Sequence, residues 1–163
     1  MKEAYKQKQL VIDEIKDKFE RSASAVVIDY MGITVSEADA MRKKLREADV
    51  DYTVYKNTLV KRAIEGTEYE SLAEVLEGPS GFAFSYNDAT APARVLSEAI
   101  KDYKKMEFKA AIVEGEYYDK DGIEVLASIP SRDVLISKFM GSIQSPVANF
   151  ARVVAQIAEQ KEA

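Results

Sequence analysis

Hydrophobic and polar residues follow helical and strand spacings in turn along the first 130 residues. Apolar side chains recur every three to four positions from Leu10 to Phe19, which predicts an amphipathic helix over residues 3–20. The short β-branched run at residues 25–30 is typical of a buried strand. The chain is therefore expected to begin with a helix followed by a core strand.

A second helix and strand pair is predicted next. Thr34 and Glu37 have the spacing of a capping box, so a helix should begin after Thr34. Residues 50–54 alternate apolar and polar side chains, which indicates a strand. We then expect a third helix that Asn57 caps and Gly66 ends.

The rest of the first 130 residues continues this pattern. The expected elements are a short helix over 68–77, a turn at 78–81, a strand over 82–86, a helix opened by Pro92, a strand over 108–114 and a short helix over 122–129. Strands thus alternate with helices from residue 25 to residue 114. The simplest architecture is α+β, a sheet of about four strands with helices packed on it, and the pattern leaves the strand order open.

The tail has a different character. Residues 134–158 carry two charged side chains, Lys138 and Arg152. Ser131 can cap a helix there, and Ser145-Pro146 can cap or bend a second segment. Apolar residues recur with an offset of 11, which returns them to nearly the same helix face, although two copies are equally compatible with chance. The matching pairs are Ile136 with Val147, Phe139 with Phe150, Met140 with Ala151, and Ile143 with Val154.

A helix so poor in charge is covered either by its own domain or by another chain. Most terminal amphipathic helices pack on their own core. The length of this segment and its position after Pro130 favour a partner instead.

Composition excludes several kinds of chemistry. The 163 residues include no Cys and no His, which excludes disulfide scaffolds, zinc fingers, thiol nucleophiles and serine–histidine triads. No phosphate-binding P-loop is present, and residues 119–124 are too short for a calcium loop. No apolar run reaches about 18 residues, so we expect no membrane partner. We predict a soluble intracellular protein without catalytic residues, metal ligands or cofactors.

A basic cluster stands out against the net charge of −5. Residues 42–62 hold seven basic side chains and three acidic ones. Asn57 and Thr58 would add polar groups beside the free N–H donors of a helix start, which suits phosphate oxygens. The ordinary alternative is a solvated charged face. No aromatic-rich strand is evident, so base stacking is not indicated.

Several motifs together resemble one family. The segment YKNTLVKRA at residues 55–63 resembles the most characteristic stretch of bacterial ribosomal protein ten of the large subunit, the ribosomal stalk-base protein. The match runs in order through nearly the whole chain. The other segments that carry it are residues 25–35, 42–48, 76–80, 91–93 and 129–132.

The resemblance implies a ferredoxin-like domain over residues 1–130 that binds large-subunit ribosomal RNA beside ribosomal protein eleven of the large subunit, in the cytoplasm. It also implies a helical tail over residues 131–163 that holds dimers of the acidic ribosomal stalk protein, which recruit translational GTPases. The two tail segments predict two such dimers.

Two sets of candidate site residues follow. The RNA-binding set is Lys8, Gly32, Arg42, Lys43, Arg46, Lys56, Asn57, Thr58, Lys61, Arg62, Gly78, Pro79 and Ser80. The stalk-protein-binding set is Leu135, Ile136, Phe139, Ile143, Val147, Phe150, Val154 and Ile157. Met31 stands where relatives usually carry Arg, so it is not counted as an RNA ligand. The alternative hypothesis is a small α/β enzyme or ligand-binding domain whose terminal helix drives self-association.

Overall fold

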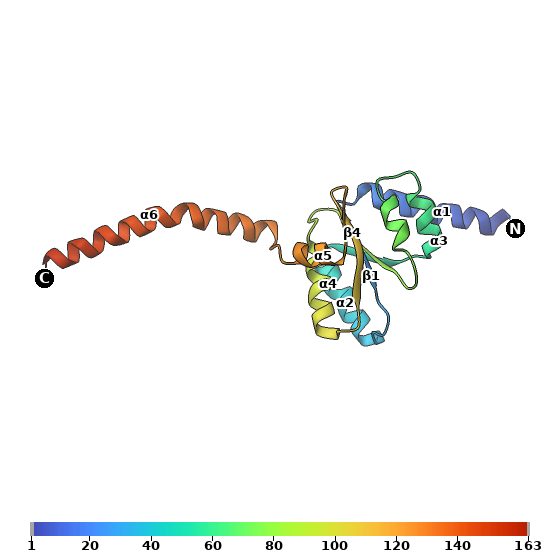
Figure 1. Ribbon diagram of the computed structural model, residues 1–163, viewed down its shortest axis with the longest axis horizontal. Coiled ribbons are helices and arrows are strands. Elements are labelled where there is room, and N and C mark those ends of the chain that lie inside the picture. The colour runs from blue at the N-terminus through green and yellow to red at the C-terminus, as the bar shows by residue number, and fades with distance from the viewer. Residues whose placement is uncertain (1, 163) are drawn as a thin grey trace. The chain divides into compact units, whose positions relative to one another are not determined.

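The computed structural model describes the backbone of residues 2–162 (Figure 1). It describes the side chains of residues 6–144 and, beyond them, those of Pro146, Asn149, Phe150, Arg152, Val153 and Ile157. The chain divides into two compact units, Met1–Ile129 and Pro130–Ala163.

The first unit contains a five-stranded sheet with helices between its strands. Its elements are α1 (Lys2–Arg21), β1 (Ser24–Asp29), α2 (Val35–Glu47), β2 (Val50–Val54), α3 (Asn57–Ile64), the 3₁₀ helix η1 (Glu70–Glu74), β3 (Gly81–Ser85), α4 (Ala91–Tyr103), β4 (Glu107–Val113), β5 (Glu116–Tyr118) and α5 (Lys120–Ala127).

The strand order is β2-β3-β1-β4-β5, and every neighbouring pair is antiparallel. The succession β1-α2-β2-β3-α4-β4 with β1 and β3 in the centre is the ferredoxin-like arrangement, so the predicted fold class is confirmed. The prediction of about four strands missed β5. This short strand forms a hairpin with β4 through Glu114 and Gly115, whose φ angles are 51° and 85°. Two positive φ angles match the twist of a two-residue hairpin turn.

Both faces of the central strands β1 and β3 are buried, which explains why these two strands are mostly apolar. Val26 and Ile28 of β1 face one core, which α2, α4 and α5 cover. Ala25 and Val27 of the same strand face a second core, which α1, α3 and η1 cover. Figure 1 shows these two helix layers on opposite sides of the sheet.

The helix starts were predicted with mixed success. The capping box of α2 is confirmed: the Thr34 amide donates to Oε2 of Glu37 at 2.7 Å, and the Glu37 amide donates to Oγ1 of Thr34 at 3.3 Å. The prediction that Asn57 caps α3 is wrong. Lys56 occupies the cap position without a side-chain hydrogen bond, because the Asn57 amide group is bonded instead to the turn before β3. The helix predicted over 68–77 is only the short η1.

The second unit contains one long helix, α6 (Arg132–Glu162), which runs through Pro146. Ser145-Pro146 therefore does not begin a separate helix. A proline inside a helix lacks the N–H that would bond one turn back, and it bends the axis. Figure 1 shows the α6 ribbon curving along its length. Within the described residues, no helix is long and apolar enough to cross a membrane.

Gly81 allows the close approach of a tyrosine ring across β2 and β3. A Cβ atom at Gly81 would lie 2.8 Å from Cε2 and 2.9 Å from Cζ of Tyr52. We therefore expect Gly81→Ala to lower the free energy of unfolding by about 1–3 kcal/mol, because the ring must move. Thermal denaturation measures this loss. The double variant with Tyr52→Ala should lose less than the sum of the two single changes, and strict additivity would contradict the contact.

Candidate nucleic-acid interface

The outer edge of the sheet at β2 is the centre of the candidate interface. β2 is the last strand in the order, so only its β3 side is paired. Helix α2 leads into this strand and α3 follows it. Most of the predicted RNA-binding residues therefore lie around one sheet edge, on α2, at the start of α3 and in the turn before β3.

One hollow of about 340 Å³ brings six predicted residues together. It is lined by Lys56, Asn57, Thr58, Gly78, Pro79 and Ser80 with Tyr30, Val54 and Tyr55. The start of α3 and the turn before β3 are thus adjacent, although about 20 residues separate them in sequence. The Asn57 amide group joins them, because Nδ2 donates to the Gly78 carbonyl at 2.7 Å.

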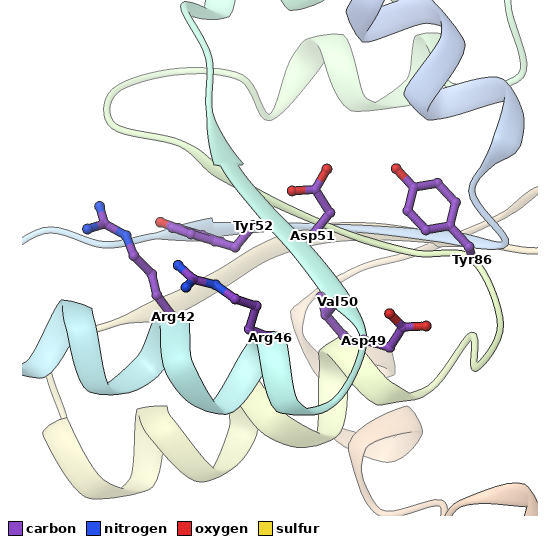
Figure 2. Close-up of a pocket in the computed structure, with 7 residues that line it drawn as sticks. All are labelled: Arg42, Arg46, Asp49, Val50, Asp51, Tyr52 and Tyr86. Atoms are coloured by element: carbon purple, nitrogen blue, oxygen red, sulfur yellow. The ribbon is translucent and has the colours of Figure 1, made fainter.

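A second hollow, of about 400 Å³, contains the two arginines of α2 (Figure 2). Figure 2 shows Arg42 and Arg46 extending from α2 along β2, next to Tyr52. Burial raises the pKa of Tyr52 to about 12, so its hydroxyl stays protonated near neutral pH. The lining residues are Arg42, Arg46, Asp49, Val50, Asp51, Tyr52 and Tyr86.

The carboxylates in this hollow already have partners. Nδ2 of Asn87 donates to Asp49 at 3.0 Å, and Nζ of Lys18 donates to Asp51 at 2.7 Å. Partial burial lowers the pKa of Lys18, but hydrogen bonds with Asp51 and Tyr55 outweigh it and the net shift is upward. Lys18 therefore stays charged and offsets Asp51. Arg42 forms an exposed pair with Asp39 at 3.3 Å, and both arginines are exposed, so they remain accessible to an anion.

A third hollow, of about 500 Å³, connects the first two. It shares Tyr30 and Val54 with the first and Arg42 and Tyr52 with the second. Gly32 lines it with a φ of +85°, and Met31 beside it is 64% exposed. The three hollows form one continuous surface along the β2 edge, which we call the β2-edge surface.

The remaining basic candidates lie elsewhere. Lys8 and Arg62 line a separate hollow of about 560 Å³ between α1 and α3. This hollow shares no lining residue with the β2-edge surface. Lys43 and Lys61 are exposed and line none of the four hollows. The structure thus gathers nine of the predicted residues into one surface and leaves four outside it.

The apolar candidates on α6 are exposed. The six whose side chains are described have exposed fractions between 44% and 72%; they are Leu135, Ile136, Phe139, Ile143, Phe150 and Ile157. The side chains of Val147 and Val154 lie outside the described set. Ile136, Ile143, Phe150 and Ile157 follow one another at intervals of seven residues, which is nearly two helical turns, so they share one helix face. Phe139 lies on the same face, within about one turn of Ile136 and Ile143. We call this face the α6 stripe.

Comparisons with known proteins match nearly the whole chain to one family. Residues 3–101 match the family model for ribosomal protein L10, and residues 129–163 match that for the ribosomal protein uL10 C-terminal region. The chain is 48% identical over 155 residues to the large ribosomal subunit protein uL10 of Clostridium tetani, covering 95% of this chain and 90% of that protein. It is 45% identical over 161 residues to the same protein of Alkaliphilus metalliredigens, covering 99% and 97%.

The chain belongs to the ribosomal protein uL10 family. The resemblance stated from the sequence motifs is confirmed, and a uL10 protein of Bacillus cereus extends it at 44% identity over 162 residues. The protein is a structural, non-enzymatic component of the large ribosomal subunit, and its place is the cytoplasmic ribosome. The alternative of a small α/β enzyme is therefore set aside.

Sequence reasoning missed several residues of the site, among them Tyr30, Lys109 and Asp29. Tyr30 lines two of the three hollows of the β2-edge surface. Lys109 of β4 and Asp29 of β1 lie behind the turn before β3, where Nζ of Lys109 is 3.5 Å from Oδ2 of Asp29. The one available signal was a lysine within the otherwise apolar run of residues 108–113. An alternating strand pattern assigns such a lysine to a solvated face, so the signal was not specific.

Proposed function

We propose that this protein is the base of the ribosomal stalk: its β2-edge surface binds large-subunit ribosomal RNA, and its α6 stripe anchors two dimers of the acidic ribosomal stalk protein. Its neighbour would be ribosomal protein eleven of the large subunit, and the anchored dimers would help to recruit translational GTPases. The observation that carries the proposal is the α6 stripe, because large apolar side chains at regular spacing stand exposed on a helix that matches the family's C-terminal region.

Electrostatics and shape support RNA as the ligand of the β2-edge surface. Arg42, Arg46 and Lys56 bring accessible positive charge to a continuous concave edge. Arginine offers paired donors to phosphate oxygens, and Asn57 and Thr58 are the first residues of α3, where helix N–H groups are free. Phosphate contacts of this kind supply much of the affinity of proteins for nucleic acids.

Hydrophobic burial supports a protein partner for the α6 stripe. Burying one large apolar side chain contributes roughly 1.5–3 kcal/mol, so several together exceed the usual cost of association. Between residues 134 and 158 the sequence around the stripe has two charged residues, Lys138 and Arg152. Both are basic, so an acidic partner would meet favourable charge there. The 11-residue recurrence supports two binding segments, hence two dimers. Ribosomal protein eleven as a neighbour rests on the family resemblance alone.

The double variant Arg42→Gln plus Arg46→Gln tests the β2-edge surface. We expect it to weaken binding to large-subunit ribosomal RNA and to flatten the plot of log affinity against log salt by about one unit per lost phosphate contact. Filter binding over a salt series measures both. Lys101→Gln plus Lys120→Gln is the matched control, since it removes the same charge from residues that line none of the four hollows. Equal slopes for the two double variants would contradict phosphate contact by the arginines.

The variants Phe139→Asp and Phe150→Asp test the two tail segments separately. Native mass spectrometry of the chain coexpressed with its acidic stalk protein should give four partner copies for the unmodified chain and two for each variant. Burying an unpaired carboxylate is costly, so each variant should lose the dimer bound at its own segment and keep the other. Ser137→Asp, about half a turn from Phe139, introduces the same charge on the other side of the helix and should retain four.

Other stoichiometries have definite meanings in this experiment. Six partner copies on the unmodified chain would keep the anchoring role and refute the number of two dimers. A complex that survives removal of residues 131–163 would refute the tail as the anchor. A self-associated chain without the partner would mean that the α6 stripe packs against a second copy of itself.

A further inference from the structure

Lys109 occupies an irregular position in the sheet. Along β1, Val27 is paired with Ala110 and Ile28 with Phe108, so Lys109 is an extra residue in β4 without a partner across the strands. Phe108 belongs to the core under α2 and α4, whereas Ala110 belongs to the core under α1 and α3. A bulge of this kind redirects one side chain, and here it removes a lysine from the regular alternation of the strand.

The Lys109 side chain is directed into the turn before β3. It is 14% exposed, and Nζ donates to the carbonyl oxygens of Glu77 and Pro79, both at 2.6 Å. Oγ of Ser80 lies 3.3 Å from the same nitrogen, and Oδ2 of Asp29 lies 3.5 Å from it. The ammonium group thus has its donors committed to this turn and its charge balanced by one carboxylate.

Asn57 completes the arrangement from α3. Its Nδ2 donates to the Gly78 carbonyl at 2.7 Å and reaches the Leu76 carbonyl at 3.5 Å. Two side chains from separate elements therefore bind four successive carbonyl groups, those of residues 76–79. Because C=O and N–H point in opposite directions across a trans peptide, the exposed Gly78 presents its N–H away from Lys109.

Asp29 extends the same arrangement to the β1–α2 loop. Its Oδ1 accepts a hydrogen bond from the Met31 amide at 2.9 Å, while Oδ2 faces Lys109. Met31 and Gly32 line the third hollow of the β2-edge surface, and Gly78 and Pro79 line the first. One partly buried ammonium group is therefore connected to two loops of that surface.

We propose that Lys109 is a positioning residue for RNA binding: it fixes the conformation of the turn at residues 76–80, and through Asp29 that of the β1–α2 loop, without contacting RNA itself. The inference rests on the proposed binding of ribosomal RNA by the β2-edge surface. Its physical basis is twofold. Carbonyl groups that point inward to Lys109 and Asn57 do not repel a phosphate. A glycine–proline turn without these hydrogen bonds has many conformations, and only some of them leave the Gly78 N–H free for an anion.

The test uses the full chain with Lys109→Met, which keeps the length of the side chain and removes all its donors. NMR relaxation without RNA should show lower backbone order parameters at Gly78 and Ser80 than in the unmodified chain. Binding to transcribed large-subunit ribosomal RNA should weaken about tenfold, while the slope of log affinity against log salt stays unchanged, because no phosphate contact is lost. Lys109→Gln retains one donor group and replaces Lys109→Met if that variant fails to fold. Its affinity for the RNA should lie between those of the unmodified chain and of Lys109→Met.

Ile123→Val is the matched control for general destabilisation. Ile123 is fully buried in the core on the opposite face of the sheet from α3, so its truncation lowers stability without touching the turn. It should bind the RNA as tightly as the unmodified chain.

Three results would overturn the inference. The first is unchanged RNA affinity in folded Lys109→Met, and the second is an equal loss of affinity in Ile123→Val. The third is a slope of log affinity against log salt that is flatter by about one unit in Lys109→Met, which would mean direct phosphate contact. Failure of the unmodified chain to prefer ribosomal RNA over an unrelated RNA of equal length would instead refute the proposed function, and the inference with it.

Discussion

Strand β1 lies in the centre of the sheet with its side chains buried on both faces, and this double burial constrains everything around it. A strand of this kind requires a helix layer on each side, so α1, α3 and η1 cover one face while α2, α4 and α5 cover the other. No open sheet face remains for a ligand. Apart from Lys109, charged side chains lie at the edges and ends of strands, on the helix exteriors and in the loops, and the candidate interface lies where β2 provides such an edge.

The turns that border this edge need internal partners for their backbone groups. Buried or half-buried carbonyls are costly unless they accept hydrogen bonds. In the turn before β3, side chains meet this need, with Lys109 from β4 and Asn57 from α3. Residues that a ligand never touches can in this way determine the shape that the ligand meets. The bulge in β4 therefore supports one turn of the candidate interface.

The C-terminal helix differs from the first unit in the exposure of its large apolar side chains. The first unit buries phenylalanines such as Phe82 and Phe84 completely, whereas α6 leaves Phe139 and Phe150 65% and 72% exposed. A stripe of this size on a helix without many charges is a surface for association rather than for solvent. The chain therefore joins a self-sufficient core to a segment whose hydrophobic surface fits a partner, which accords with a structural component of a large assembly.

The sequence by itself determined the elements and the family. Helical spacing from Leu10 to Phe19, the capping box at Thr34 and the apolar run before Gly32 depend on local periodicity and local hydrogen bonds, so they could be predicted from neighbouring residues. The tertiary structure decided the strand order, the fifth strand, and the placement of Asn57 and Lys109. The fifth strand is local, but its three residues are too few to show a strand pattern. The strand order and the placement of Asn57 and Lys109 depend on contacts between residues more than 20 positions apart. At Asn57, the Gly78 carbonyl competes with the helix start for the side-chain amide group. The spacing of residues along the chain does not show which of the two hydrogen bonds the Asn57 amide group forms.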